Sequence, residues 1–131
     1  MKKQWNKVYL MGAIMAAALP LLSGCVAIVA AGAGAGAYAY LRGSLDSHLN
    51  ASFEDSLPAV RNAMSGMGLI KIKEVSDIRS AKFTYRDALD NRIVVILTEK
   101  QKNLTAVSIR VGHVGDENRS IEILNRINDE L

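Results

Sequence analysis

The sequence predicts an α+β domain of two layers, in which a mainly antiparallel sheet of about five strands carries two helices on one face. Three observations lead to this fold class. Apolar residues recur at two spacings, every second residue or every third to fourth, and the spacings follow the order β-α-β-β-β-β-α between residues 38 and 131. Each helical stretch has one apolar stripe, and most strands have one apolar face, so all of them require a shared core. Residues 25–131 are enough for one such domain but too few for two.

The first strand and the first helix follow each other directly. Residues 41–51 alternate between apolar or small and polar side chains, which predicts a strand with one face in water. The spacing then lengthens to three or four residues, which predicts an amphipathic helix over residues 53–67. Its stripe consists of Phe53, Leu57, Val60, Met64 and Met67.

The ends of this helix carry recognisable signals. Ser52 is suited to be the N-cap. Pro58 lacks a backbone N–H, so the helix either kinks there or begins nearer Ser56. Gly66 and Gly68 are expected to end it.

Four further strands are expected in a meander. Residues 69–75 and 79–86 contain short alternating patterns, and Asp90-Asn91 marks a turn. Residues 92–99 are almost all β-branched or apolar, which predicts a central strand covered on both faces for part of its length. Residues 105–111 alternate again and complete the sheet.

A second helix follows Gly112 and Gly115, which break the last strand. Asp116 is suited to cap this helix through its side chain. The two glycines at a helix start also resemble an anion site, but a capping carboxylate would repel an anion, so capping is favoured. The expected buried stripe consists of Ile123, Leu124, Ile127 and Leu131.

The amino-terminal segment has the layout of a secretory signal. Three lysines precede an apolar run over residues 8–22, and small residues follow it. The next residues resemble the lipobox of bacterial lipoproteins, in which a peptidase cuts before the cysteine and the thiol carries diacylglycerol. By this resemblance residues 1–24 are a signal peptide, and Cys25 carries lipid, including fatty acyl groups such as palmitate. The peptidase would recognise Leu22, Ser23 and Gly24. A plain signal peptide, or a membrane anchor with an incidental cysteine, is the alternative.

Residues 25–37 are rich in glycine and alanine and are expected to form a tether between the lipidated cysteine and the domain over 38–131. A second interpretation stays open. If the signal is not cleaved, the apolar residues 8–41 are long enough to span a bilayer, and Gly32 and Gly36 have the spacing of a helix-packing motif.

Composition excludes some classes of function. The excess of three positive charges is matched by Lys2, Lys3 and Lys7, so the chain after residue 24 is formally neutral. A basic patch for nucleic acid is therefore not expected. Cys25 is the sole cysteine, so no disulfide and no cysteine-based metal site is expected.

No pattern of residues indicates an enzyme. His48 and His113 are far apart in sequence and belong to no metal-binding motif, so they are expected to be surface or capping residues. The serines lack the context of a nucleophile elbow. Neither a catalytic residue nor a metal or cofactor is predicted, apart from the covalent lipid.

Basic residues are concentrated between residues 71 and 110, and several of them alternate with core positions. They are expected to share the open face of the sheet, where they would meet anionic headgroups, a cell-wall polymer or another envelope protein. The alternative is a solvated face kept soluble by its charges. The candidate residues are Lys71, Lys73, Lys82, Arg86, Arg92 and Arg110.

Three stretches resemble a known family. They are the Gly/Ala run after Cys25, the residues 40–45, and the residues 110–117 that lead into the last helix. Together they resemble small bacterial lipoproteins carrying the domain of unknown function thirty-five sixty-eight. The resemblance covers essentially the whole mature chain. It implies a lipoprotein of the cell envelope with an α+β domain, and no activity.

The sequence therefore predicts a lipid-anchored envelope protein that acts as a structural or binding module facing the periplasm. Val26 stands where enteric lipoproteins retained at the inner membrane have an aspartate, so by that resemblance the outer membrane is implied. Two alternatives remain. One is the integral anchor with an uncleaved signal. The other is a carrier of lipid or a small apolar ligand, with a pocket lined by Phe53, Met64, Met67 and Phe83.

Overall fold

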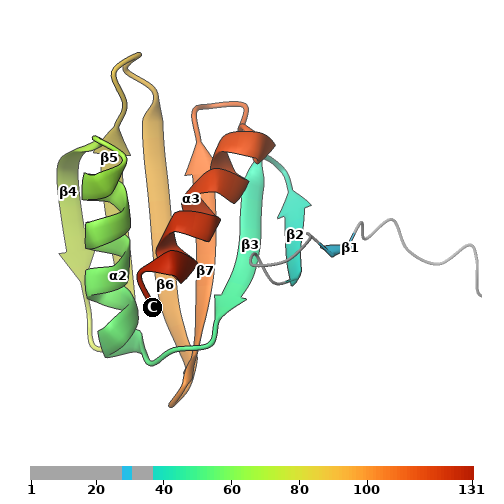
Figure 1. The fold of residues 1–131 in the computed structure, drawn as a ribbon, viewed down its shortest axis with the longest axis vertical. Helices are drawn as coiled ribbons and strands as arrows, with labels where there is room; N and C mark the ends of the chain where they lie inside the picture. The colour runs from blue at the N-terminus through green and yellow to red at the C-terminus, as the bar shows by residue number, and fades with distance from the viewer. Residues whose placement is uncertain (1–27, 31–36) are drawn as a thin grey trace, which may run out of the picture.

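The computed structural model describes residues 28–30 and 37–131, which form one antiparallel sheet with two helices across one of its faces (Figure 1). The seven strands lie in the order β1-β2-β3-β7-β6-β5-β4. The predicted α+β class is confirmed. The elements are β1 (Ile28–Ala30), β2 (Ala37–Leu41), β3 (Ser44–Leu49), α2 (Phe53–Gly66), β4 (Ile70–Ser76), β5 (Ser80–Arg86), β6 (Arg92–Gln101), β7 (Leu104–Val111) and α3 (Glu117–Asp129).

The strand expected over residues 41–51 is in fact the end of one strand and the whole of the next. Arg42 and Gly43 both have positive φ, 54° and 82°, and form the two-residue turn between β2 and β3. Such turns match the twist of antiparallel strands. The alternation continues in sequence across the turn, which hid the reversal. Leu41 consequently lies on the opposite face from Leu45 and is 48% exposed.

The first helix begins at Phe53, so the start nearer Ser56 is wrong. The Ser52 hydroxyl oxygen accepts a hydrogen bond from the Asp55 backbone N–H at 3.1 Å, which confirms the N-cap. Pro58 lies inside the helix, on its exposed side. After the helix the chain turns at Gly68, whose φ is 71°.

The second helix is capped by Asp116, whose side chain accepts from the Arg119 backbone N–H at 3.0 Å. Ile123, Leu124 and Ile127 are buried as expected. The prediction that Leu131 belongs to the stripe is wrong. The helix ends at Asp129, and Leu131 is 49% exposed.

The core lies between the helices and one face of the sheet. Helix α2 contacts β5, β6 and β7, helix α3 contacts β3 and β7, and the two helices contact each other (Figure 1). The central strand β6 shows most clearly that only one of its faces lies against the helices. Ile93, Val95 and Leu97 are fully buried, whereas Val94 is half-buried and Ile96 is 39% exposed. The expectation that β6 is covered on both faces for part of its length is wrong for the described residues, because their helices cover one face only.

Strand β1 lies within the segment expected to be a tether over residues 25–37. Ile28 lies opposite Ala39 and Ala30 opposite Ala37 in an antiparallel pair. The sheet therefore extends beyond the predicted start of the domain at residue 38.

Candidate functional site

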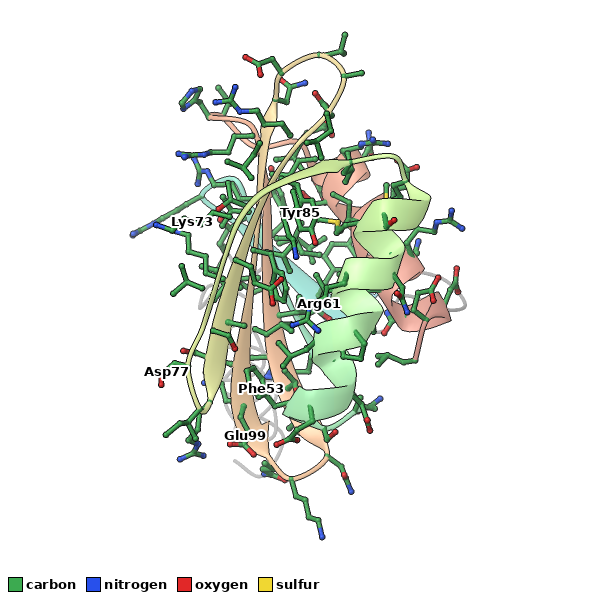
Figure 2. The ribbon with its side chains drawn as sticks, turned by 90° about the vertical axis from the view of Figure 1, so that its left-hand side faces the viewer. Phe53, Arg61, Lys73, Asp77, Tyr85 and Glu99 are labelled. Atoms are coloured by element: carbon green, nitrogen blue, oxygen red, sulfur yellow. The ribbon has the colours of Figure 1, made fainter. Side chains whose placement is uncertain are left out.

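The face of the sheet turned away from the helices, here called the open face, is the candidate functional surface. Strand register assigns its residues, because side chains of directly paired residues lie on the same face. One row runs from Lys73 on β4 to Thr84, Val94 and Arg110, and the next runs from Val75 to Lys82, Ile96 and Ser108. Figure 2 shows Lys73 on this side and Tyr85, Arg61 and Phe53 on the helix side.

A shallow hollow of about 360 Å³ lies on the open face, and we call it the basic hollow. Three of its residues are cations, and no carboxylate lines it. Within the described part of the chain, Lys73, Lys82 and Arg92 have no ion-pair partner. The lining residues are Lys73, Val75, Lys82, Thr84, Arg92 and Val94.

The structure brings three of the six predicted cations together there and places the other three in different roles. Arg86 pairs with Asp90 at 2.7 Å. Arg110 donates hydrogen bonds to two backbone carbonyl groups in neighbouring turns. Lys71 lies opposite Tyr85, on the helix side of the sheet. The sequence pattern did not reveal this side change, because a bulge between positions 71 and 73 shifts the register of β4.

A charged cluster on the helix side of β4 was not anticipated from the sequence. The Arg61 guanidinium on α2 donates to both carboxylate oxygens of Glu74, with Nη2–Oε1 at 2.6 Å, and Lys71 Nζ lies 2.9 Å from Oε2. These hydrogen bonds, chiefly those from Arg61, lower the pKa of Glu74 to about 2 and raise the pKa of Arg61. Burial raises the pKa of the neighbouring Tyr85. The cluster ties α2 to the edge strand, and the thirteen-residue separation of Arg61 and Glu74 gave no sequence signal.

Two of the three stretches on which the family resemblance rests meet in space. The β2–β3 turn packs against the loop between β7 and α3, and an added Cβ at Gly43 would lie 2.5 Å from the Val114 carbonyl oxygen. Arg110 donates to the carbonyl oxygen of Arg42 at 2.8 Å and to that of His113. An added Cβ at Gly115 would collide with the Gly43 backbone. We call this contact the clasp. It gives the two stretches a structural role in joining β2 and β3 to the start of α3.

Side-chain carboxylates accept backbone hydrogen bonds both at the start of α3 and in the turn before β6. Asp116 caps α3 as described above, so its carboxylate occupies the helix start. In the β5–β6 turn, hydrogen bonds from Asn91 above all lower the pKa of Asp87. The Asp116 carboxylate therefore makes the start of α3 unsuited to an anion.

The two histidines lie apart and on the surface. His48 is exposed on β3 opposite Ala106, whereas His113 is exposed in the loop beyond the far end of β7. No group of three or more histidine, cysteine, aspartate or glutamate side chains is placed to hold a metal among the residues that the structure describes.

The residues proposed to line a ligand pocket belong to the packed core instead. Phe53, Met64 and Phe83 are at most 4% exposed, and Met67 packs against the core. The hollows found at the surface of the described ranges have other linings. None of these observations supports a carrier of apolar ligands.

The predicted lipidation site lies outside the described residues. This holds for Cys25 and for the peptidase recognition residues Leu22, Ser23 and Gly24, as well as for Gly32 and Gly36. Within residues 28–30 and 37–131, neither helix has the length and hydropathy needed to cross a membrane.

Comparison with known proteins gives one family. A model of the family "Protein of unknown function (DUF3568)" matches residues 7–130. Comparison with curated proteins gives no match. Since the family match covers nearly the whole chain, the protein belongs to the DUF3568 family.

Proposed function

We propose that this protein is a lipid-anchored component of the bacterial cell envelope, and that its domain is a non-enzymatic binding module that acts through the open face. Cys25 carries the lipid, and the domain faces the periplasm from the outer membrane. Two or three acyl chains make such an anchor nearly permanent, at roughly 0.8 kcal/mol per buried CH₂.

The observation that supports a binding role is the contrast between the faces of the sheet. The helix side is filled by a continuous core, whereas the open face keeps unpaired cations beside exposed branched aliphatic side chains. Val75 is 52% exposed and Ile96 is 39% exposed on this face. Exposed aliphatic and cationic groups together are typical of surfaces that bind a partner.

The anchor is tested by the mass of the protein extracted from membranes. We expect the native chain to lack residues 1–24 and to carry added diacylglycerol on Cys25, so that detergent is needed to extract it. The variant Cys25→Ala should be neither lipidated nor cut before residue 25. If Cys25→Ala is trimmed at the same bond and fractionates like the native chain, the proposed anchor is wrong.

Two further variants serve as a control and as a test of location. Ser65→Ala changes an exposed residue of α2. The cleavage site, the lipid on Cys25 and the fractionation of this variant should be those of the native chain. Val26→Asp should move the lipoprotein from the outer to the inner membrane in a host with enteric-type sorting. An unchanged distribution of Val26→Asp would contradict the outer-membrane assignment without affecting the anchor.

A further inference from the structure

We propose that the basic hollow binds the phosphate groups of anionic phospholipids, so that the domain lies with its open face on the membrane that holds Cys25. This inference rests on the lipid anchor proposed above and names the partner of the open face. The occupant is the bilayer surface itself, not a soluble ligand.

The charges in the hollow match such a surface. Lys73, Lys82 and Arg92 come from three adjacent strands, and none of them is neutralised by a described carboxylate. The sole acidic side chain on the described open face of the strands is Asp46. It lies three strands from Lys82 in the same row, roughly 14 Å away at the usual strand spacing.

The apolar residues distinguish a membrane surface from a dissolved polyanion. Val75 and Val94 line the hollow itself, and Ile96 lies opposite Lys82 on the next strand. At a bilayer surface these side chains enter the boundary between headgroups and acyl chains while the cations reach the phosphates. A hydrophilic cell-wall polymer offers such aliphatic groups nothing to bury against.

The two layers of the domain have opposite charge, which fixes the orientation. Helices α2 and α3 with the caps Asp116 and Glu130 contain seven acidic and three basic side chains, whereas the remaining described residues contain ten basic and six acidic ones. An anionic bilayer therefore attracts the sheet and repels the helix layer. In Figure 2 the two layers lie on opposite sides, with Lys73 pointing away from the helices.

Covalent geometry brings the sheet to the membrane. Cys25 is three residues before Ile28, the first residue of β1, and three residues span at most about 11 Å. The β1 edge is therefore close to the lipid. Strand β5 is five strand spacings from β1, roughly 24 Å, so the basic hollow lies within reach of the bilayer that holds Cys25. The anchor also raises the local concentration of headgroups around the hollow.

The orientation is tested with single thiols in the full lipidated protein, reconstituted into vesicles. Ser108→Cys places a thiol on the open face beside Ile96, and Ser65→Cys places one on the exposed side of α2 as the matched control. The probe is the rate of reaction with a membrane-impermeant maleimide. It is compared between phosphatidylcholine vesicles and vesicles that also contain phosphatidylglycerol.

We expect the Ser108→Cys thiol to react about tenfold more slowly, or slower still, on phosphatidylglycerol vesicles at low salt, and the Ser65→Cys thiol to react at the same rate on both. The reason is that each well-placed cation near an anionic surface changes the population by roughly fivefold. Equal rates for Ser108→Cys on the two vesicles would overturn the proposal. So would protection of Ser65→Cys instead.

Charge variants test whether the protection of the Ser108→Cys thiol depends on the cations of the basic hollow. Lys73→Gln, Lys82→Gln and Arg92→Gln combined in the Ser108→Cys chain should bring the two rates within about twofold of each other. Lys100→Gln, Lys102→Gln and Arg126→Gln remove the same charge outside the hollow and should keep the protection. Circular dichroism checks that both chains are folded. Protection that survives the first set would overturn the role of the hollow.

Soluble anions distinguish the other sources of the same chemistry. Inorganic phosphate and a soluble anionic cell-wall polymer are each added to phosphatidylcholine vesicles. Protection of Ser108→Cys by either probe, at an ionic strength matched with sodium chloride, would favour a free anion or the polymer and overturn the membrane assignment. No protection by either is the expected result.

The thiols also separate this inference from the anchor. Cys25 is the sole native cysteine, so a lipidated chain with Ser108→Cys has one reactive thiol after denaturation, and an unlipidated chain has two. Two thiols would mean that the anchor proposal has failed. One thiol with no protection would mean that the anchor holds and the orientation is wrong.

Discussion

Neighbouring residues of the same strands form the two faces of the sheet. One face is buried under the helices, whereas the other is exposed. On β5, Phe83 is fully buried against the helices, while Lys82 before it is exposed on the open face. On β6, Val95 is fully buried and Ile96 after it is 39% exposed. Side chains on a strand alternate between faces, so a single residue step decides whether an aliphatic group enters the core or remains in solvent.

The residues that stabilise the fold therefore lie on a different face from those proposed to bind a partner. The covered face contains the large apolar side chains whose burial stabilises the fold, at about 1.5–3 kcal/mol each. Residues of the open face contribute little to the core and are free to be selected for contacts with a partner. Substitutions on the two faces should therefore differ in their effect on the free energy of unfolding.

The largest effect is expected at Phe83. Phe83→Ala removes a fully buried ring and should lower the free energy of unfolding by about 3–5 kcal/mol. Lys82→Ala, one residue earlier and on the other face, should change it by less than about 0.5 kcal/mol. Urea denaturation followed by circular dichroism measures both. Similar losses for the two variants would contradict the separation of the faces.

The clasp tests whether the end of the sheet depends on backbone packing and not on either face. Gly43→Ala combines a φ of 82° with a Cβ placed 2.5 Å from the Val114 carbonyl oxygen, and should cost about 3 kcal/mol. Gly68→Ala has a similar φ of 71° but nothing within 4 Å, and should cost about 1 kcal/mol. Thermal unfolding of the two variants gives the comparison. Equal losses would show that backbone strain alone, without the clasp, accounts for Gly43.

Glu74 tests the edge strand β4, which the helices reach through Arg61. The pKa of Glu74 is about 2, below its ordinary value of 4.5, so its ion pairs stabilise the fold above about pH 5 and lose this effect as the pH falls toward 2. Glu74→Gln should lower the free energy of unfolding by about 1 kcal/mol at pH 7, allowing for solvent screening of the half-exposed Arg61.

The measurement is the difference in unfolding free energy between the native chain and Glu74→Gln at several pH values. This difference should shrink steadily between pH 5 and pH 2. Arg61→Gln should give a similar loss at pH 7, and the double variant should lose little more than either alone. A difference that does not change with pH would contradict the lowered pKa.

The smallest effect is expected at Ile96. Ile96→Thr keeps a β-branched side chain on the open face and should change the free energy of unfolding by less than about 0.5 kcal/mol. Val95→Thr places a hydroxyl in the core and should cost about 1–3 kcal/mol. Chemical denaturation of both variants checks this pair. A large loss for Ile96→Thr would show that the open face is part of the stabilising core.

Local patterns predicted most of the elements correctly. Ser52 and Asp116 were recognisable as N-caps because a cap needs only a side-chain acceptor within the first turn. The stripes of α2 and α3 followed from helical spacing. The β2–β3 turn was missed because Arg42 is an uncommon residue at positive φ and because the alternation continues across the turn.

The candidate site was predictable only in part. Lys82 and Arg92 lie beside buried residues of their strands, so their face could be predicted from the sequence. Neither neighbour of Lys73 is in the core, so its face did not follow from the alternation. Lys71 could not be assigned, since the bulge in β4 changes the side to which it points. Glu74 gave no signal either, because its partner Arg61 is on another element.

The sequence alone determined the class of the fold, the two caps and the alternation that separates core from surface, since these depend on residues a few positions apart. Tertiary structure decided which surface stays open, which cations gather in the basic hollow, and how the clasp and the Arg61–Glu74 pair join distant elements. Strand order and register set these contacts, and both depend on how the whole chain packs.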